Sequence, residues 1–191
     1  MNAPVLERPT PALVIKYGEQ FDQSNAALTD QALTQLVAAF PDNRDVSAVL
    51  LKATAINSLY ATNIYAIFQV AQHICSLNID PKLAQGSLDV IDEIAVITLK
   101  GKKKRNYSFA TKYCSWHRPD VYPIFDSYVE RLLWAFRRQD RFAEYKRGEM
   151  WQYPRYVEII EQFRAHYDLG EFGFKKLDKF LWQYGMEVFA A

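Results

Sequence analysis

The residues best able to do chemistry gather between Lys100 and Val129, in the stretch KGKKKRNYSFATKYCSWHRPDVYPIFDSYV. It begins with the densest positive charge in the chain, continues into an aromatic-rich segment, and reaches the carboxylate of Asp126 after a proline-bounded turn. Basic groups hold phosphates, and a carboxylate can stabilise positive charge or activate water. The stretch therefore contains the parts of a site that acts on a polyanion.

The basic run covers residues 100–105, and five of these six residues carry a positive charge. Gly101 interrupts the lysines between two expected helices, so backbone N–H and ammonium groups could face one phosphate together. The alternative is a solvated loop at a helix C-terminus, where cations are favourable. The run consists of Lys100, Gly101, Lys102, Lys103, Lys104 and Arg105.

The aromatic segment predicts a short helix over residues 106–117. Phe109, Tyr113 and Trp116 recur at positions i, i+4 and i+7, a spacing more typical of a core face than of a base-stacking platform. Lys112 lies beside this stripe. It is either a buried amine or a lysine that extends its ammonium to water.

Asp126 is the carboxylate on which a catalytic interpretation depends. Asp126, followed by Ser127 and Glu130 three residues later, is a helix-start signature, and such a cap contributes about 1 kcal/mol. A capping aspartate can also be catalytic, because the cap fixes its rotamer. Both roles stay open from the residues alone.

The elements that must position these residues are helical. No stretch alternates with period two between hairpin turns, so the predicted fold class is all-α, with about seven to nine helices. Residues 1–28 are expected to form an extended arm and residues 29–191 one helical domain. The expected helices cover 30–40, 46–77 with a bend near 61–63, 88–99, 106–117, 127–145, 155–169 and 174–189.

Composition limits the class of protein. The chain has 191 residues, is 50% hydrophobic and carries a net charge of +1, so any attraction to nucleic acid must come from local clustering. Two cysteines cannot form a disulfide framework or hold an iron–sulfur cluster, and the three histidines lack metal-ligand spacing. We expect a cytoplasmic monomer, nucleoid-associated in a bacterium, with no cofactor, metal or membrane segment.

Three segments resemble the helix–hairpin–helix–GPD superfamily of DNA glycosylases, nearest its 8-oxoguanine DNA glycosylase-like branch. They are LLKATAINSLYATNI (50–64), SFATKYCSWHRPDVYPIFDSYV (108–129) and LDKFLWQYG (177–185). The resemblance implies a compact multi-helix glycosylase-like fold with a helix–hairpin–helix motif. It also implies activity on double-stranded DNA that carries a damaged or modified base.

The middle segment carries the superfamily's catalytic motif, in which Pro-Val-Asp places an essential aspartate at a helix N-terminus. The matching residues are Pro123, Ile124 and Asp126, with Phe125 inserted. The superfamily's glycine-rich hairpin is replaced here by a lysine run with one glycine, Gly101, so the hairpin is degenerate.

Bifunctional members of the superfamily also carry a nucleophilic lysine nearly twenty residues before the aspartate. Tyr107 occupies that position here, and the nearest lysines are Lys104, three residues earlier, and Lys112, five residues later. The resemblance implies Asp126 as the catalytic carboxylate and leaves both lysines as candidate nucleophiles. The implied DNA contacts are Lys100, Gly101, Lys102, Lys103, Arg105 and Arg118. The candidate base-pocket residues are Asn57, Tyr60, Tyr107, Trp116, His117, Phe125 and Tyr128.

Two alternatives accompany this prediction. One is a non-catalytic nucleic-acid-binding module on the same scaffold, and the other is a helical interaction protein whose basic loop docks an acidic partner. For Asn57 and Tyr60, three apart on an apolar helix, a satisfied core hydrogen bond is the alternative to a base contact.

Overall fold

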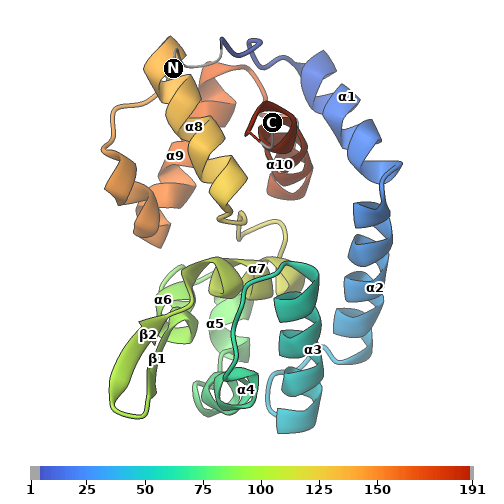
Figure 1. Cartoon of the computed structure of the whole chain (residues 1–191), viewed down its shortest axis with the longest axis vertical. Coiled ribbons are helices and arrows are strands. Elements are labelled where there is room, and N and C mark those ends of the chain that lie inside the picture. Colours follow the sequence, from blue (N-terminus) through green and yellow to red (C-terminus); the bar gives the residue numbers. More distant parts are fainter. Residues whose placement is uncertain (1–4, 190–191) are drawn as a thin grey trace. The chain divides into compact units, whose positions relative to one another are not determined.

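A computed structural model describes residues 5–189 of the chain (Figure 1). Within these residues the regular structure consists of ten α-helices, one 3₁₀ helix and a single two-stranded sheet. The predicted all-α class is confirmed. There are more helices than the seven to nine predicted, because the N-terminal segment is helical and one long apolar segment is divided.

The chain divides into two compact units, each with its own core. We call residues 5–27 and 125–189 the terminal unit, and residues 28–124 the middle unit. The prediction placed one boundary, between residues 28 and 29. The structure has a second boundary, between residues 124 and 125. Residues 5–27 therefore share a unit with residues 125–189.

The terminal unit is a group of helices in which α1 packs against α10 and α10 packs against α8 (Figure 1). Its elements are α1 (Pro11–Asp22), α8 (Ser127–Asp140), η1 (Arg147–Trp151, a 3₁₀ helix), α9 (Tyr153–His166) and α10 (Phe174–Phe189).

Helix α1 corrects the prediction of an extended arm over residues 1–28, of which residues 1–4 lie outside the described part of the chain. The Thr10 hydroxyl accepts the Leu13 N–H at 3.2 Å, and Pro11 stands at the first helical position. Both features start helices. The helix then buries one face, formed by Leu13, Val14, Tyr17, Gly18 and Phe21.

Before α1, the described part of the N-terminal segment is fixed by hydrogen bonds to the terminal unit. The Gln139 side chain accepts from the Leu6 N–H at 2.8 Å and donates to the Leu6 carbonyl at 3.0 Å. The Glu7 N–H donates to the Tyr184 hydroxyl at 2.8 Å. These bonds attach the segment to α8 and α10.

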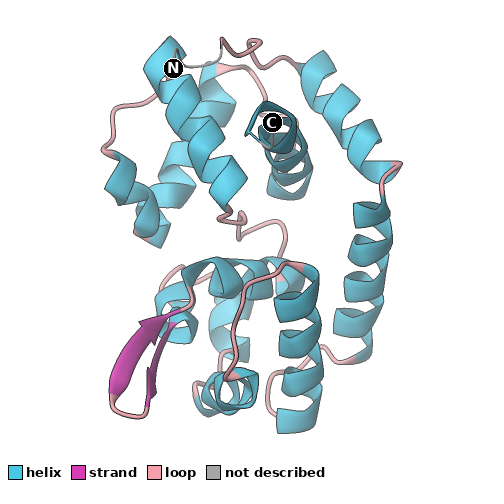
Figure 2. Ribbon diagram, in the orientation of Figure 1, coloured by secondary structure: helices cyan, strands magenta, loops and turns pink. Residues whose placement is uncertain are grey.

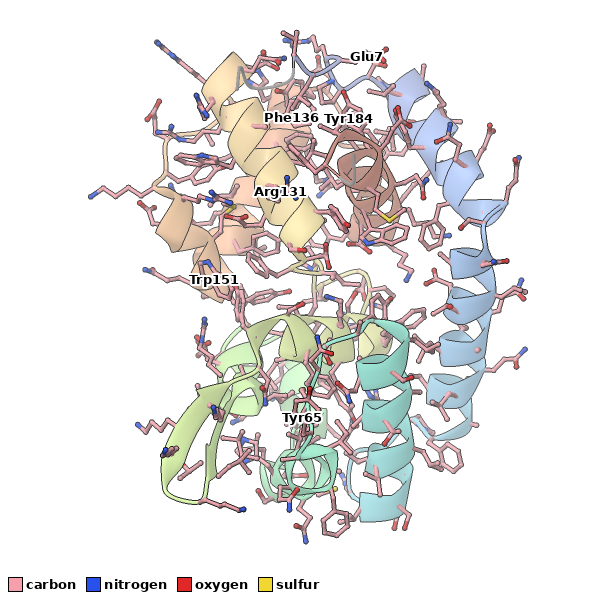
Figure 3. The ribbon with its side chains drawn as sticks, viewed as in Figure 1. Glu7, Tyr65, Arg131, Phe136, Trp151 and Tyr184 are labelled. Carbon is pink, nitrogen blue, oxygen red and sulfur yellow. The ribbon has the colours of Figure 1, made fainter. Side chains whose placement is uncertain are left out.

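Aromatic rings form the core of the terminal unit. Phe136, on α8, lies 5.6 Å from Phe163, 5.7 Å from Tyr167 and 6.2 Å from Tyr184, measured between ring centroids (Figure 3). Such tilted and edge-on pairs add to the stabilisation that burial provides. The core therefore joins α8, α9 and α10.

The middle unit contains most of α2 (Asn25–Ala39), which starts just before the unit boundary, and seven further elements. Helix α3 packs on α4 and α7, and α6 packs on α7. The seven elements are α3 (Val46–Leu59), α4 (Ile67–Ser76), α5 (Asp80–Gln85), α6 (Val90–Ala95), β1 (Val96–Leu99), β2 (Lys102–Arg105) and α7 (Tyr107–His117).

The long apolar segment after Asp45 breaks where it was predicted to bend. Ala61 and Asn63 adopt φ values of 48° and 58°, in the left-handed region that ends a helix. The Asp45 carboxylate caps α3 by accepting the Ala48 N–H at 2.8 Å. The predicted bend is confirmed as a break between two helices.

The basic run is not a loop, which corrects the prediction for residues 100–105. It forms the turn and second strand of an antiparallel β-hairpin, drawn in magenta in Figure 2. Lys100 and Gly101 have φ values of 48° and 75°, and two successive left-handed residues match the twist of a two-residue hairpin. The helix predicted to reach residue 99 ends at Ala95, because the β-branched residues 96–98 pair as a strand.

Gly185 permits a close approach between α10 and the beginning of α8. A Cβ at position 185 would lie 3.0 Å from the Tyr128 Cβ and 3.1 Å from the Tyr128 carbonyl oxygen. Because backbone atoms must move to admit it, we predict that Gly185→Ala lowers the free energy of unfolding by about 1–3 kcal/mol in urea denaturation. The control is Gly148→Ala, whose Cβ would meet nothing within 4 Å. Equal stability of the two variants would contradict the close approach.

Candidate active site

Asp126 is the N-cap of α8, as the sequence predicted. Its backbone is extended, with φ −138° and ψ 156°, and its Oδ1 accepts the Tyr128 N–H at 2.8 Å. The bond fixes the carboxylate rotamer at the positive end of the helix dipole. The carboxylate is therefore held in one orientation at the start of α8.

Lys112 is a buried amine on α7. Its side chain is 1% exposed, and Nζ donates to the Ser108 hydroxyl at 2.6 Å. Nζ also lies 5.3 Å from the centre of the Tyr60 ring, and Trp116 donates its indole N–H to the Tyr60 hydroxyl at 3.2 Å. The fold thus brings together three predicted site residues, Tyr60, Lys112 and Trp116, and adds Ser108.

Lys104, the alternative nucleophile, has a different environment. It lies on β2, opposite Ile97 in the hairpin register, and its side chain is exposed. Its exposed side chain lacks the burial that desolvates a nucleophilic lysine. Of the two candidates, Lys112 has the surroundings of a positioned amine.

The exposed charge of the hairpin belongs to Lys100, Lys102, Lys103 and Lys104. Among residues 5–189, none of these four lysines forms an ion pair. Arg105 differs, because it donates to Asp92 at 2.6 Å and its guanidinium lies 4.3 Å from the centre of the Tyr107 ring.

Tyr107, a predicted base-pocket residue, and Arg118, a predicted DNA contact, both form contacts within the chain. Tyr107 is 2% exposed and lies under Arg105, and burial raises the pKa of its hydroxyl. The Arg118 guanidinium donates to both carboxylate oxygens of Asp120, at 3.0 and 2.9 Å, and to two carbonyls at the end of α5.

Asn57 holds the turn between α3 and α4. Its Oδ1 accepts from the Thr62 hydroxyl at 2.7 Å and from the Ile64 N–H at 2.9 Å, and its Nδ2 donates to the Ile64 carbonyl at 3.0 Å. These hydrogen bonds correspond to the alternative given for Asn57, in which its side chain is satisfied within the protein and does not contact a base. They fix the backbone of the loop that follows Tyr60.

Lys52, on α3, is a buried cation that the sequence analysis did not identify. Its side chain is fully buried, and Nζ donates to the carbonyls of Phe40 and Asp42 at 2.9 Å each and to Asn43 Oδ1 at 2.8 Å. Burial lowers the pKa of Lys52 to about 8, so the ammonium remains mostly charged at neutral pH. A lone lysine within the apolar run of α3 was the signal available in the sequence.

Asn43 extends this buried polar cluster to α7 and α5. Its Oδ1 also accepts from the Tyr113 hydroxyl at 2.6 Å, and its Nδ2 donates to Asp80 at 2.7 Å. The His117 Nε2 lies 3.3 Å from the Lys52 ammonium, and the rings of His117 and Tyr113 are 5.2 Å apart. Burial and the neighbouring Lys52 lower the pKa of His117 to about 3, so the imidazole is neutral.

Two of the predicted base-pocket residues belong to the terminal unit, together with Asp126. Phe125 is 2% exposed, and its ring lies 4.8 Å from Trp151 and 5.3 Å from Tyr156. Tyr128 is half-buried beside Gly185. The other candidate residues belong to the middle unit.

Two further properties concern metals and membranes. Within residues 5–189, no group of three or more histidine, cysteine, aspartate or glutamate side chains is arranged to hold a metal ion. In the same part of the chain, no helix has the length and apolar character required to cross a lipid bilayer.

These features define an all-α protein of two units, with a buried polar cluster and an exposed basic hairpin. The family model HI_0787_N, described as an N-terminal domain, matches residues 13–121. An uncharacterised protein from Haemophilus influenzae is 39% identical over 149 residues, which make up 78% of this chain and 71% of the relative. The chain belongs to this family. No solved structure matches it. Lys104 and Lys112 lie within residues 13–121, which the family model matches, and Asp126 follows them.

The neutral His117 predicts a pH dependence of stability. In the unfolded chain His117 gains a proton as the pH falls below about 6.5, whereas in the folded protein it does so only near pH 3. The free energy of unfolding should therefore decrease as the pH falls through this window, by about 1.4 kcal/mol per unit. His117→Gln removes the titration, so urea denaturation between pH 6.5 and 5 should show a shallower slope.

The control for this experiment is His166→Gln, at an exposed position on α9, which should keep the wild-type slope. Identical slopes for wild type and His117→Gln would show that His117 is not held neutral.

Proposed function

We propose that this protein is a DNA glycosylase, which removes a damaged or modified base from double-stranded DNA. The observation that supports the proposal most is the buried amine of Lys112, on the helix that follows the hairpin. The resemblance of residues 108–129 to the glycosylase motif adds Asp126, at the helix start where that motif requires its aspartate. Asp126 belongs to the terminal unit and Lys112 belongs to the middle unit, so each residue's role is argued from the contacts within its own unit.

Asp126 is the proposed catalytic carboxylate. Cleavage of an N-glycosidic bond develops positive charge on the sugar, which a fixed carboxylate stabilises, or which a water activated by that carboxylate attacks. Asp126 Oδ1 accepts the Tyr128 N–H, so the carboxylate is already oriented and need not reorganise during the reaction. Water attack through Asp126 alone is sufficient for base removal.

Lys112 is the proposed nucleophile for a second route. In its deprotonated form the Lys112 amine forms a bond to the sugar C1′ while the C1′–N bond breaks. The electron pair of that bond leaves with the base, which takes up the proton that the attached Nζ gives up. The sugar ring then opens to an imine on Nζ, and water hydrolyses it. Ser108 and Tyr60 hold the amine in position for this attack.

The hairpin lysines supply the proposed contacts to the DNA backbone. Lys100, Lys102, Lys103 and Lys104 are exposed and have no ion pair among residues 5–189, so their charge is available to phosphates. This observation also favours the second candidate function, a module that binds nucleic acid without catalysis. A helical protein that docks an acidic partner through the hairpin is the third.

The carboxylate is tested by Asp126→Asn, assayed for abasic sites on a panel of duplexes carrying damaged or naturally modified bases. Asparagine caps helices as well as aspartate does, so the fold should persist. We expect base release to fall at least 100-fold, with duplex affinity unchanged within about threefold. The control is Asp45→Asn, at the equivalent cap of α3, which should retain activity. Parallel loss of binding and release would assign Asp126 a capping role alone.

The amine is tested by borohydride, which reduces an imine and links protein to DNA permanently. Lys112→Met should abolish the adduct and Lys104→Ala should retain it, while thermal melting confirms that both variants fold. The reverse pattern would assign the nucleophile to Lys104, and absence of any adduct from the active wild type would leave only the Asp126 route. Salt-sensitive duplex binding without base release across the panel would favour the binding module. Absence of such binding would favour the acidic-partner alternative.

A further inference from the structure

A second positively charged site lies in the terminal unit. It is a pocket of about 430 Å³, within the size range of small-molecule sites. None of the described residues that line it carries a carboxylate side chain. Its lining residues are Val5, Arg131, Trp134, Ala135, Arg138, Gln139, Arg147 and Phe189.

One face of α8 forms the floor of this pocket. Arg131, Trp134, Ala135 and Arg138 stand at i, i+3, i+4 and i+7, so they follow one another along one side of the helix (Figure 3 labels Arg131). The two arginines are about 10 Å apart along the helix axis. Ala135 provides a short side chain between them, which leaves space over the helix beside the Trp134 ring.

Two of the three arginines are held in place before any ligand binds. The Arg147 guanidinium donates through Nε and Nη2 to the Glu130 carboxylate at 2.5 and 2.7 Å, and the Arg131 guanidinium lies 4.3 Å from the centre of the Phe189 ring. Arg138 is exposed and has no ion pair with any residue from 5 to 189. Glu130 offsets one charge, so two positive charges remain available.

The aromatic walls are fixed as well. The Trp134 ring lies 4.8 Å from the Arg137 guanidinium and 5.9 Å from the Tyr145 ring, so contacts outside the pocket's lining determine its orientation. Prior ordering reduces the entropy that binding would cost. The pocket thus combines rigid aromatic surfaces with fixed and free guanidinium groups.

We propose that this pocket binds a nucleoside phosphate. The planar fork of arginine matches the oxygens of a phosphate, and indole and phenyl rings stack on a planar base. An isolated inorganic anion would leave the aromatic walls unused, and a neutral nucleoside would leave the arginines unpaired. The ligand is either a free nucleotide or one nucleotide unit of a nucleic-acid strand, since both present the same groups. The proposal is independent of the glycosylase activity proposed above.

The experiment is isothermal titration calorimetry of the full chain with deoxyadenosine monophosphate, deoxyadenosine, inorganic phosphate and a short single-stranded deoxyadenosine oligonucleotide. Deoxyadenosine monophosphate should bind at least tenfold more tightly than deoxyadenosine or phosphate. The double variant Arg131→Gln/Arg138→Gln should weaken its binding at least tenfold. The matched control is Arg141→Gln, at the exposed C-cap of the same helix and outside the pocket, which should leave Kd unchanged within about twofold.

The strand arm distinguishes the two sources of the ligand. Tighter binding of the oligonucleotide than of the mononucleotide, lost in the double variant, would identify a strand, and equal or weaker oligonucleotide binding would identify a free nucleotide. No saturable binding of deoxyadenosine monophosphate, or equal binding by wild type and double variant, would overturn the proposal. Asp126→Asn should leave mononucleotide binding unchanged, so failure of the pocket and failure of the glycosylase are separate results.

Discussion

The middle unit depends on the buried ammonium of Lys52. A charge removed from water must be satisfied by polar partners, and breaking such a buried arrangement costs about 3–5 kcal/mol. The carbonyls of Phe40 and Asp42 and the side chain of Asn43 satisfy it, so the turn before α3 is fixed against that helix. Because Asn43 also accepts from Tyr113, the same cluster fixes α7, the helix that carries Lys112 and Trp116.

In the terminal unit, close packing holds the beginning of α8 against α10. Gly185 brings α10 against the backbone of Tyr128, and the N–H of Tyr128 in turn holds the carboxylate of Asp126. Leu6 and Glu7 add hydrogen bonds from the N-terminal segment to α8 and α10. Leu6 and Glu7 thereby stabilise the unit in which the proposed catalytic carboxylate lies.

The net charge of +1 does not show that some of the chain's cations form ion pairs and others do not. Arg105, Arg118 and Arg147 each pair with a neighbouring carboxylate and contribute to the fold. The four hairpin lysines, and Arg138 in the terminal unit, are not paired in this way within the described residues. An arginine's planar fork suits fixed ion pairs, whereas exposed lysines keep their hydration and long-range attraction for a polyanion. Composition could not separate these two groups, because pairing depends on neighbours in space.

The sequence by itself determined the all-α class, the break within residues 45–77 and the start of α8 at Asp126. Helical periodicity, capping and left-handed residues act over a few positions, so they can be read along the chain. Only the tertiary structure decided that residues 96–105 form a hairpin, that Lys52 is buried, and that Lys112 lies against Tyr60. A strand as polar as β2 is specified by pairing with β1, and the environment of an amine is specified by side chains far away in the sequence. Neither contact can be predicted from the pattern of neighbouring residues in the sequence.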